Sequence, residues 1–426
     1  MNKYKAYTLQ NFLEIPRIAN LPSQQKFAMK VVAHVLPFRC NNYVVEELIN
    51  WDDIPNDPMF VLTFPQKDML KPHNFSQMAD ALKSGASKQQ IKEVANQIRM
   101  QLNPHPAGQM HNIPMFEGHH LSGMQHKYRE TVLFFPSESQ TCHAYCSFCF
   151  RWPQFVGLNE MKFAMREVDL LIEYVRQHES ITDILFTGGD PLIMRTRKLA
   201  FYIEPLLEAN IPHLRTIRIG TKALGYWPYR FLTDRDADDL LRLFEKVVKA
   251  DKHLSIMAHV NHHAELKPKA AQKAIHRIRN TGAQIRTQSP LLAHINNDPD
   301  MWAEMWREQV HLGLIPYYMF VVRDTGAQHY FGIPLVQAWQ TFRKAYQQIS
   351  GICRTVRGPS MSANPGKVHI LGVPEVKGEK VIALQFIQAR NPAWVGRPFF
   401  AKYNEKAIWL DELEPAFGKK KFFFEK

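Results

Sequence analysis

The sequence predicts an α/β fold in which a parallel sheet forms an open, partial barrel of six strand–helix units. The chain has 426 residues and is 45% hydrophobic, enough apolar material for one large domain with additions at both ends. Between residues 131 and 350, short apolar runs alternate with amphipathic segments of helical period, a pattern typical of repeated βα units. Six such units are too few for the closed eight-strand barrel.

The apolar runs are predicted as strands and the amphipathic segments between them as helices. The strands are Val132–Phe135, Ile184–Phe186, Thr216–Ile219, Leu254–His259, Ile285–Gln288 and Pro316–Val322. The helices include Val168–Glu179, Asp236–Ala250, Pro268–Asn280, Pro299–Leu312 and Pro334–Ile349. The barrel is therefore expected to span residues 126–350.

Extensions are predicted on both sides of this barrel. Residues 1–125 are expected to be mostly helical, because Phe27–Leu36 and Phe75–Gln101 carry apolar residues at helical spacing and Ser87 can cap a helix. Residues 351–426 begin with a turn-rich loop, Gly358–Lys367, and then contain alternating strand patterns at Val368–Leu371 and Val381–Phe386.

Three of the five cysteines, Cys142, Cys146 and Cys149, form a C-x3-C-x2-C run after the first predicted strand. A disulfide framework is not expected in a long, cysteine-poor chain. Cysteine thiolates suit iron–sulfur clusters and zinc. Three can hold a [4Fe–4S] cluster with one iron left open, whereas zinc would take His143 as a fourth ligand. Buried structural cysteines are the third alternative. Cys40 and Cys353 each stand alone.

Charge and hydropathy limit the partners. The net charge of +13 is compatible with nucleic acid, but the concentrated basic tract is confined to Lys419–Lys421, which favours a solvated surface with sites for anionic cofactors. No apolar run has the length needed to span a bilayer, and Met1–Lys5 do not resemble a signal peptide. We expect a cytoplasmic protein without a membrane or nucleic-acid partner.

The cysteine run, with Phe148 before its last cysteine, resembles the signature of the radical S-adenosylmethionine (SAM) enzymes. More narrowly, His126–Leu133 and Arg151–Gly157 resemble the lysine 2,3-aminomutase family, and the similarity extends from Asn56 to Phe400. This resemblance implies a [4Fe–4S] cluster that cleaves SAM to a radical and pyridoxal 5′-phosphate (PLP) as second cofactor. The implied reaction moves the α-amino group of an L-amino acid to Cβ. An external electron donor would reduce the cluster, and a homo-oligomer is left open.

Polar residues follow each predicted strand, and in such barrels the chemistry lies at the carboxyl ends of the strands. Gly188, Gly189 and Asp190 follow the second strand, where paired glycines let the backbone approach a ligand. By resemblance, this motif binds the amino group of SAM, and the regions of His259 and Gln288 face SAM or PLP. Taken singly, each motif is more often a turn or a packed group.

Lys367 is predicted at the end of the turn-rich loop. Without context it is a solvated lysine, but the resemblance implies that it binds PLP covalently. In place of the family's glycine-rich loop, this chain has Ser-Ala-Asn-Pro-Gly before the lysine. By resemblance, Arg151 holds the substrate α-carboxylate with its guanidinium fork, and Lys127 or Arg129 holds the PLP phosphate.

The substrate remains open at this stage. Lysine-specific relatives use two aspartates to hold the distal ammonium, and here Asn297 or Asp298 falls at the first position and Arg323 or Asp324 at the second. Lysine is the default and needs both aspartates turned inward, whereas Asn297 and Arg323 turned inward would favour glutamate. Two other classes are a radical SAM enzyme that modifies a macromolecule without PLP, and a zinc-stabilised binding module.

Overall fold

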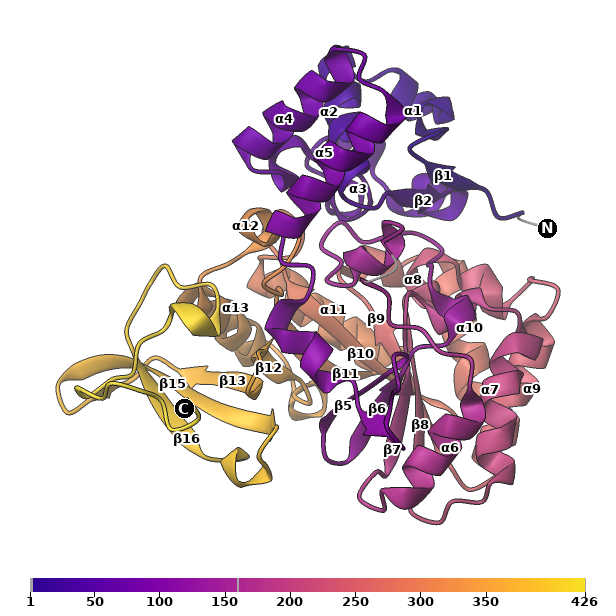
Figure 1. The fold of residues 1–426 in the computed structure, drawn as a ribbon, viewed down its shortest axis with the longest axis vertical. Helices are drawn as coiled ribbons and strands as arrows, with labels where there is room; N and C mark the ends of the chain where they lie inside the picture. Colours follow the sequence, from indigo (N-terminus) through magenta and orange to yellow (C-terminus); the bar gives the residue numbers. More distant parts are fainter. Residues whose placement is uncertain (1–2, 159–160, 426) are drawn as a thin grey trace.

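The computed structural model describes residues 3–158 and 161–425 and centres on one large sheet (Figure 1). The strands of this sheet are β5 (Met124–Tyr128), β6 (Thr131–Phe134), β7 (Asp183–Phe186), β8 (Thr216–Thr221), β9 (His253–His259), β10 (Gln284–Leu291), β11 (Ile315–Val321), β12 (Arg357–Ser362), β13 (Gly366–Gly372), β14 (Glu375–Val376), β15 (Glu379–Ala389) and β16 (Pro398–Lys402). From β6 to β12, neighbouring strands pair in parallel and in chain order. Antiparallel strands flank this region, with β5 beside β6 and β13 beside β12.

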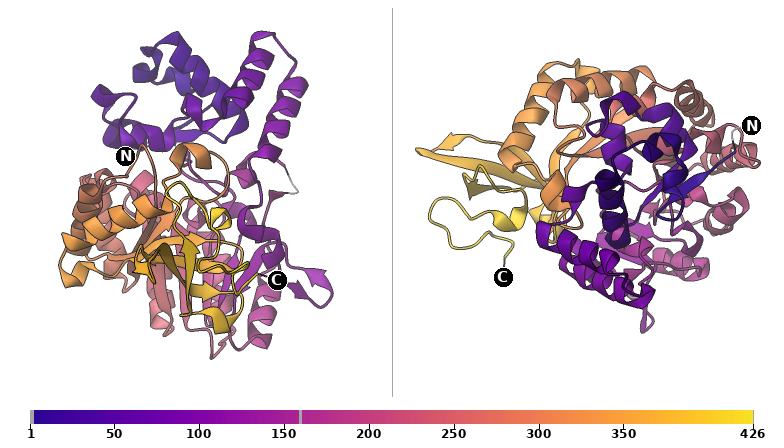
Figure 2. Two further views of the ribbon diagram at one scale, coloured as in Figure 1. Left: turned by 90° about the vertical axis from the view of Figure 1, so that its left-hand side faces the viewer. Right: turned by 90° about the horizontal axis from the view of Figure 1, so that it is seen from above.

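Helices cover the outer face of the parallel region, as the view from above shows (Figure 2). They are α6 (Val168–Gln177), α7 (Thr196–Glu208), α9 (Ala237–Lys249), α10 (Lys269–Asn280), α11 (Pro299–His311) and α13 (Leu335–Gln347). Side chains alternate along each strand. Val132, Ile184 and Ile217 are buried in the core between sheet and helices. Their neighbours Leu133 and Leu185 face the inner side, where they line a cavity.

The predicted strands agree with β6–β11 to within a few residues. One helix, α7, was not predicted. Phe75–Gln101 forms two helices, α4 (Pro72–Lys83) and α5 (Lys88–Gln101), which are separated at Gly85, whose φ is +72°. The loop predicted over Gly358–Lys367 is wrong at both ends, because Arg357–Ser362 is strand β12, which pairs with β11, and Lys367 lies in strand β13, which begins at Gly366. Ser87 does cap α5, and its hydroxyl accepts from the Gln90 amide at 3.3 Å.

The N-terminal residues 3–102, here called the cap, pack over the loops at the carboxyl ends of the strands (Figure 1). The cap contains α4 and α5 together with α2 (Ser23–Val35), α3 (Pro58–Thr63) and a two-stranded sheet of β1 (Ala6–Thr8) and β2 (Arg39–Asn41). Its hydrophobic core continues into those loops through Ala144, Trp152 and Tyr226. The cap and the loops at the carboxyl ends of the strands therefore share one core.

The C-terminal strands β13, β15 and β16 form a third core with α13 and the aromatic tail. Lys367 lies in β13, where it is in register with Ser362 of β12 and Gln388 of β15. In the described part of the chain, no helix combines the length and apolar character needed to cross a bilayer.

Candidate functional site

A cavity of about 630 Å³ lies on the inner face of the sheet, within the range of ligand pockets in enzymes. It is lined by residues from β5 through β15 and from the loop that carries the three cysteines. Ten of the twelve residues predicted as site residues line it: Lys127, Cys142, Cys146, Cys149, Arg151, Gly189, Asp190, His259, Gln288 and Lys367. The other two, Gly188 and Arg129, are not among its lining residues.

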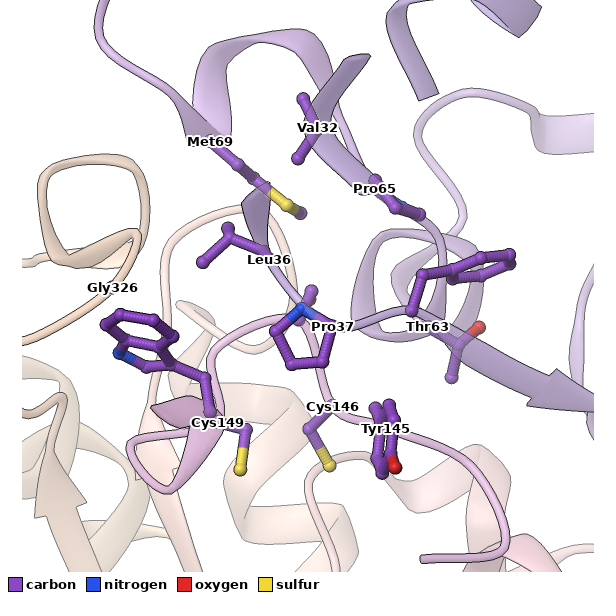
Figure 3. A pocket seen from close by; sticks show the side chains of 13 residues that line it. Val32, Leu36, Pro37, Thr63, Pro65, Met69, Tyr145, Cys146, Cys149 and Gly326 are labelled. Atoms are coloured by element: carbon purple, nitrogen blue, oxygen red, sulfur yellow. The ribbon is translucent and has the colours of Figure 1, made fainter. Parts of the chain in front are cut away.

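Cys142, Cys146 and Cys149 are free thiols on one wall of this cavity. Figure 3 shows the sulfurs of Cys146 and Cys149 side by side, both directed away from Pro37 and Leu36 of the cap. Burial raises the pKa of Cys146 to about 11 and that of Cys149 to about 12. Nucleophilic cysteines have lowered pKa values, so this environment does not resemble that of a catalytic thiol.

Backbone hydrogen bonds from the cap hold the cysteine loop in place. The amide of Tyr145 donates to the Arg39 carbonyl at 2.8 Å, and the amide of Ser147 donates to the Leu62 carbonyl at 2.9 Å. The Tyr4 hydroxyl donates to the His143 carbonyl at 2.6 Å. Arg39 also donates a side-chain hydrogen bond to the Thr141 hydroxyl, 102 residues later in the chain. The conformation of the cysteine loop therefore depends on residues of the cap that lie far away in the sequence.

The glycine pair after β7 is required by the same loop. A Cβ at Gly188 would lie 2.3 Å from the Ser139 hydroxyl, and one at Gly189 would lie 2.3 Å from the Thr141 carbonyl oxygen. The amide of Gly189 donates to the Ser139 carbonyl at 2.9 Å. The glycines thus allow the strand end and the cysteine loop to meet, and only Gly189 reaches the cavity.

Asp190 is buried and already accepts several hydrogen bonds. Its carboxylate accepts from the Thr221 hydroxyl at 2.8 Å, from the Lys222 amide at 2.8 Å and from the Leu192 amide at 2.9 Å. These bonds join the ends of β7 and β8. Asp190 therefore holds these two strand ends together, in addition to lining the cavity.

His259 and Gln288 are paired in register at the ends of β9 and β10. The His259 ring stacks on Phe148 of the cysteine loop at 6.0 Å between ring centroids. Burial, with a contribution from Lys222, lowers the pKa of His259 to about 3, so the ring is neutral near pH 7. A neutral imidazole can donate or accept one hydrogen bond to a ligand in the cavity.

His143, the alternative fourth ligand for zinc, is buried but is not among the lining residues of the cavity. Its ring packs edge-on against Tyr4 of the cap at 5.9 Å. Over residues 3–158 and 161–425, no three His, Cys, Asp or Glu side chains are grouped as a preformed site for a single metal ion.

Two buried arginines meet at one aromatic ring in the cavity. The guanidinium carbons of Arg151 and Arg323 lie 4.9 and 4.8 Å from the centroid of Phe150. Arg151 Nη1 and Arg323 Nε are buried and have no hydrogen-bond partner within the described part of the protein. Burial lowers the pKa of Arg151 to about 10 and also lowers that of Arg323. Buried donors without partners are costly, so both are suited to an anionic ligand.

Two lysines share the cavity with these arginines. The Lys367 amine lies 4.1 Å from the Tyr318 ring centroid, and burial together with Arg218, Arg357 and Arg323 lowers its pKa to about 7. Lys127 donates a hydrogen bond to the Ala363 carbonyl, and burial lowers its pKa to about 6. Near pH 7 the Lys127 amine is therefore mostly neutral and the Lys367 amine about half neutral, and the neutral form is the one that attacks a carbonyl.

The remaining predicted residues lie away from the cavity. Arg129 is exposed in the turn between β5 and β6. Asp298 caps α11, where its carboxylate accepts from the Asp300 amide at 2.9 Å. Asn297 is exposed and contacts the Thr341 hydroxyl at 3.4 Å. Asp324 accepts from the Asn103 side chain and the Ala107 amide, and its other carboxylate oxygen lies 4.0 Å from Arg323 Nε. Of the four residues considered for substrate choice, Arg323 lines the cavity.

The charge of the cavity is strongly unbalanced. Its lysines and arginines are Lys127, Arg151, Arg218, Lys222, Arg286, Arg323 and Lys367, and its lining carboxylates are Asp183 and Asp190. Asp183 is paired with Arg218, and Asp190 is bound by backbone and hydroxyl donors. Arg218 and Arg286 were not predicted from the sequence. Both could have been found as charged residues within the predicted strands Thr216–Ile219 and Ile285–Gln288.

Comparisons with known proteins give relatives over nearly the whole chain. The chain is 31% identical over 405 residues to a protein of Aquifex aeolicus named "Putative L-lysine 2,3-aminomutase", covering 95% of each. It is 26% identical to a "Glutamate 2,3-aminomutase" of Clostridioides difficile, over 67% of this chain and 60% of that protein. The structure of SuiB from Streptococcus suis aligns with a TM-score of 0.31 at 14% identity, over 60% of this chain and 54% of that one. No family model matches.

Proposed function

This chain belongs to the lysine 2,3-aminomutase family, and we propose that it is a radical SAM aminomutase that moves the α-amino group of an acidic L-amino acid to Cβ. The observation that carries the proposal is one cavity lined by the three thiols, by Lys367 and by Arg151 and Arg323, each of which has one buried donor atom without a hydrogen-bond partner. We further assign β6–β11 with their helices to a partial (βα)6 barrel, to which β12 adds a seventh parallel strand.

The donor set fits the cofactors that this reaction needs. The three free thiols on one loop would hold a [4Fe–4S] cluster, which would supply an electron to SAM. Lys367 would bind PLP, because its amine is enclosed beside Tyr318 and about half of it is neutral at pH 7. When bound, the cluster and SAM supply a carbon radical that removes a hydrogen atom from the substrate, and PLP supplies a conjugated system for the migrating nitrogen.

The residues of the chain position these groups and exclude water. The cap and the cysteine loop enclose the thiols, and Gly189 brings the end of β7 against that loop. His259 stays neutral and leaves the positive charge of the wall to the lysines and arginines. Arg151 would hold the α-carboxylate of the substrate through its free Nη1 donor. Positioning of this kind supplies much of the rate enhancement in radical enzymes. An external one-electron donor would reduce the cluster.

The acidic substrate follows from the second arginine. A distal ammonium buried in this cavity would need a free carboxylate, and Asp183 and Asp190, the carboxylates on the described lining, are already engaged. Asp298 and Asp324, which lysine would need, make their hydrogen bonds elsewhere. Arg323 instead offers a buried positive group with a free donor beside Phe150. A distal carboxylate satisfies that donor, whereas an ammonium would be repelled.

The direct test is anaerobic reconstitution with iron, sulfide, SAM and PLP, followed by separate incubations with L-glutamate, L-aspartate and L-lysine. Nuclear magnetic resonance of the products is expected to show a β-amino acid from an acidic substrate. Turnover of lysine without turnover of either acid would overturn the substrate assignment. Reductive cleavage of SAM with no product from any amino acid, by a protein that binds no PLP, would favour the modification of a macromolecule.

Covalent binding of PLP to Lys367 should follow a pH profile centred near 7. The neutral amine attacks the aldehyde, so attachment slows as pH falls below about 7, the pKa of Lys367, rather than below the usual value for lysine. Stopped-flow absorbance of PLP mixed with the apoprotein measures this profile. Borohydride reduction and peptide mapping should then locate PLP on Lys367.

Lys127→Gln is the matched control, because Lys127 is a second buried lysine with a lowered pKa in the same cavity. This variant should retain the covalent label, and Lys367→Gln should lose it. A label found on Lys127 in the unsubstituted protein would contradict the assignment of Lys367 while leaving the use of PLP intact.

A further inference from the structure

Tyr226 lies directly behind one of the cluster thiols. It ends the short helix α8 (Ala223–Tyr226), is 1% exposed, and places its hydroxyl oxygen 3.3 Å from the sulfur of Cys146. The Asn41 side chain of the cap donates to the Tyr226 carbonyl at 2.9 Å and to the His143 carbonyl at 3.2 Å. One cap residue therefore fixes both the tyrosine and the cysteine loop, which sets their separation.

A buried ion pair fixes the tyrosine ring from its face. The Lys222 amine lies 4.5 Å from the centroid of the Tyr226 ring. That amine donates to Glu265 at 2.6 Å and to Asn261 at 2.9 Å. A Cβ at Gly225 would lie 2.1 Å from the Glu265 carboxylate, so the glycine leaves room for this pair. A cation at the ring face attracts π-electron density and makes the phenol a stronger hydrogen-bond donor.

The direction of the bond is set once Cys146 binds iron. A ligating cysteine is a thiolate and has no proton to donate, so the hydroxyl must be the donor. A tyrosine phenol carries a single O–H donor, and here its oxygen lies 3.3 Å from the Cys146 sulfur. A hydrogen bond to a ligand sulfur stabilises the more negative, reduced state of a cluster more than the oxidised state.

We propose that Tyr226 donates a hydrogen bond to the Cys146 sulfur and thereby raises the reduction potential of the iron–sulfur cluster. The inference rests on the proposed function, because it requires a cluster on this loop. Tyr226 is a positioning residue in this assignment, since it acts on the cluster through Cys146. Its effect is to make reduction by the external donor easier.

The test is the reduction potential of the reconstituted Tyr226→Phe variant, measured by electron paramagnetic resonance at a series of solution potentials. Loss of one charge-assisted hydrogen bond is expected to lower the ratio of reduced to oxidised cluster about tenfold at a fixed potential, equivalent to about 59 mV for one electron. Tyr145→Phe is the matched control. This variant removes a hydroxyl from the cysteine loop itself, but that hydroxyl contacts the Thr141 hydroxyl at 2.9 Å and not a sulfur.

A second measurement covers the case in which Tyr226→Phe fails to bind iron. Pulsed electron paramagnetic resonance of the unsubstituted protein in D2O should detect an exchangeable deuteron beside the Cys146 sulfur, in addition to the deuteron of the Arg151 amide at the Cys149 sulfur. Absence of the deuteron beside Cys146 overturns the inference, as does a Tyr226→Phe variant that retains its iron with an unchanged or raised potential. An unsubstituted protein that assembles no cluster at all would instead refute the proposed function, and the inference with it.

Discussion

Replacing Cys142, Cys146 or Cys149 with alanine is expected to abolish both the iron–sulfur chromophore and the reductive cleavage of SAM. These three residues are the thiols on the cavity wall, and a cluster deprived of one of three protein ligands is left with two. Absorbance and iron and sulfide content of the anaerobic protein measure the cluster, and formation of 5′-deoxyadenosine under dithionite measures cleavage. We expect both to fall to background in each single variant and in the triple variant.

Cys353→Ala provides the control for this experiment. Cys353 is also a buried free thiol, but it packs in the main hydrophobic core and does not line the cavity. Its replacement should leave the chromophore and SAM cleavage intact. Reductive cleavage of SAM by the triple-cysteine variant would show that the cluster, if present, is held elsewhere.

Arg323→Ala is expected to lower kcat/KM for the acidic substrate about 100-fold or more, because it leaves a buried carboxylate without its partner at a cost of about 3 kcal/mol. Arg323→Lys should recover only part of this loss, since an ammonium keeps the charge but not the planar fork. Steady-state kinetics with the preferred acid give the measurement, and SAM cleavage without substrate should be unaffected.

Arg286→Gln tests whether the effect comes from Arg323 itself or from the net charge of the cavity. Arg286 also lines the cavity, and its guanidinium packs on Tyr317 at 5.4 Å. Its replacement removes the same charge from a different wall and should have a much smaller effect. Equal losses in both variants would mean that the cavity attracts acids only through its overall charge. Undiminished turnover of the acid by Arg323→Ala would contradict the assignment of this residue.

The regular part of the fold could be predicted because hydrophobic periodicity is a local property. The apolar runs that gave β6–β11 are continuous and are bounded by polar strand ends. α7 was missed although it buries Leu199, Ile203 and Leu206, since Pro205 inside it interrupts the helical pattern. β12 was missed because Gly358-Pro359 is typical of a turn, while pairing with β11 makes it a strand.

Site residues that belong to a sequence motif could be predicted, whereas the direction in which a given side chain points could not. The cysteines, Gly189, His259 and Lys367 follow from motifs, and the structure brings them to one cavity. Whether Asn297 or Asp298, and Arg323 or Asp324, faces inward depends on the tertiary contacts of each side chain. Asp298 is used as a helix cap and Asp324 as a partner for Asn103, neither of which the local sequence reveals. Arg129 was predicted by resemblance to the family and lies on an exposed turn.

The hydrogen bonds between the cap and the cysteine loop also bear on how the chain is made. Arg39 and Leu62, which receive the amides of Tyr145 and Ser147, leave the ribosome well before the cysteines do. The core of the cap includes Ala144, Trp152 and Tyr226, so the cap completes its packing only after the cysteine loop and α8 have been made. The cap and the cysteine loop are therefore expected to fold together, and iron delivery can follow onto a loop whose backbone is already anchored.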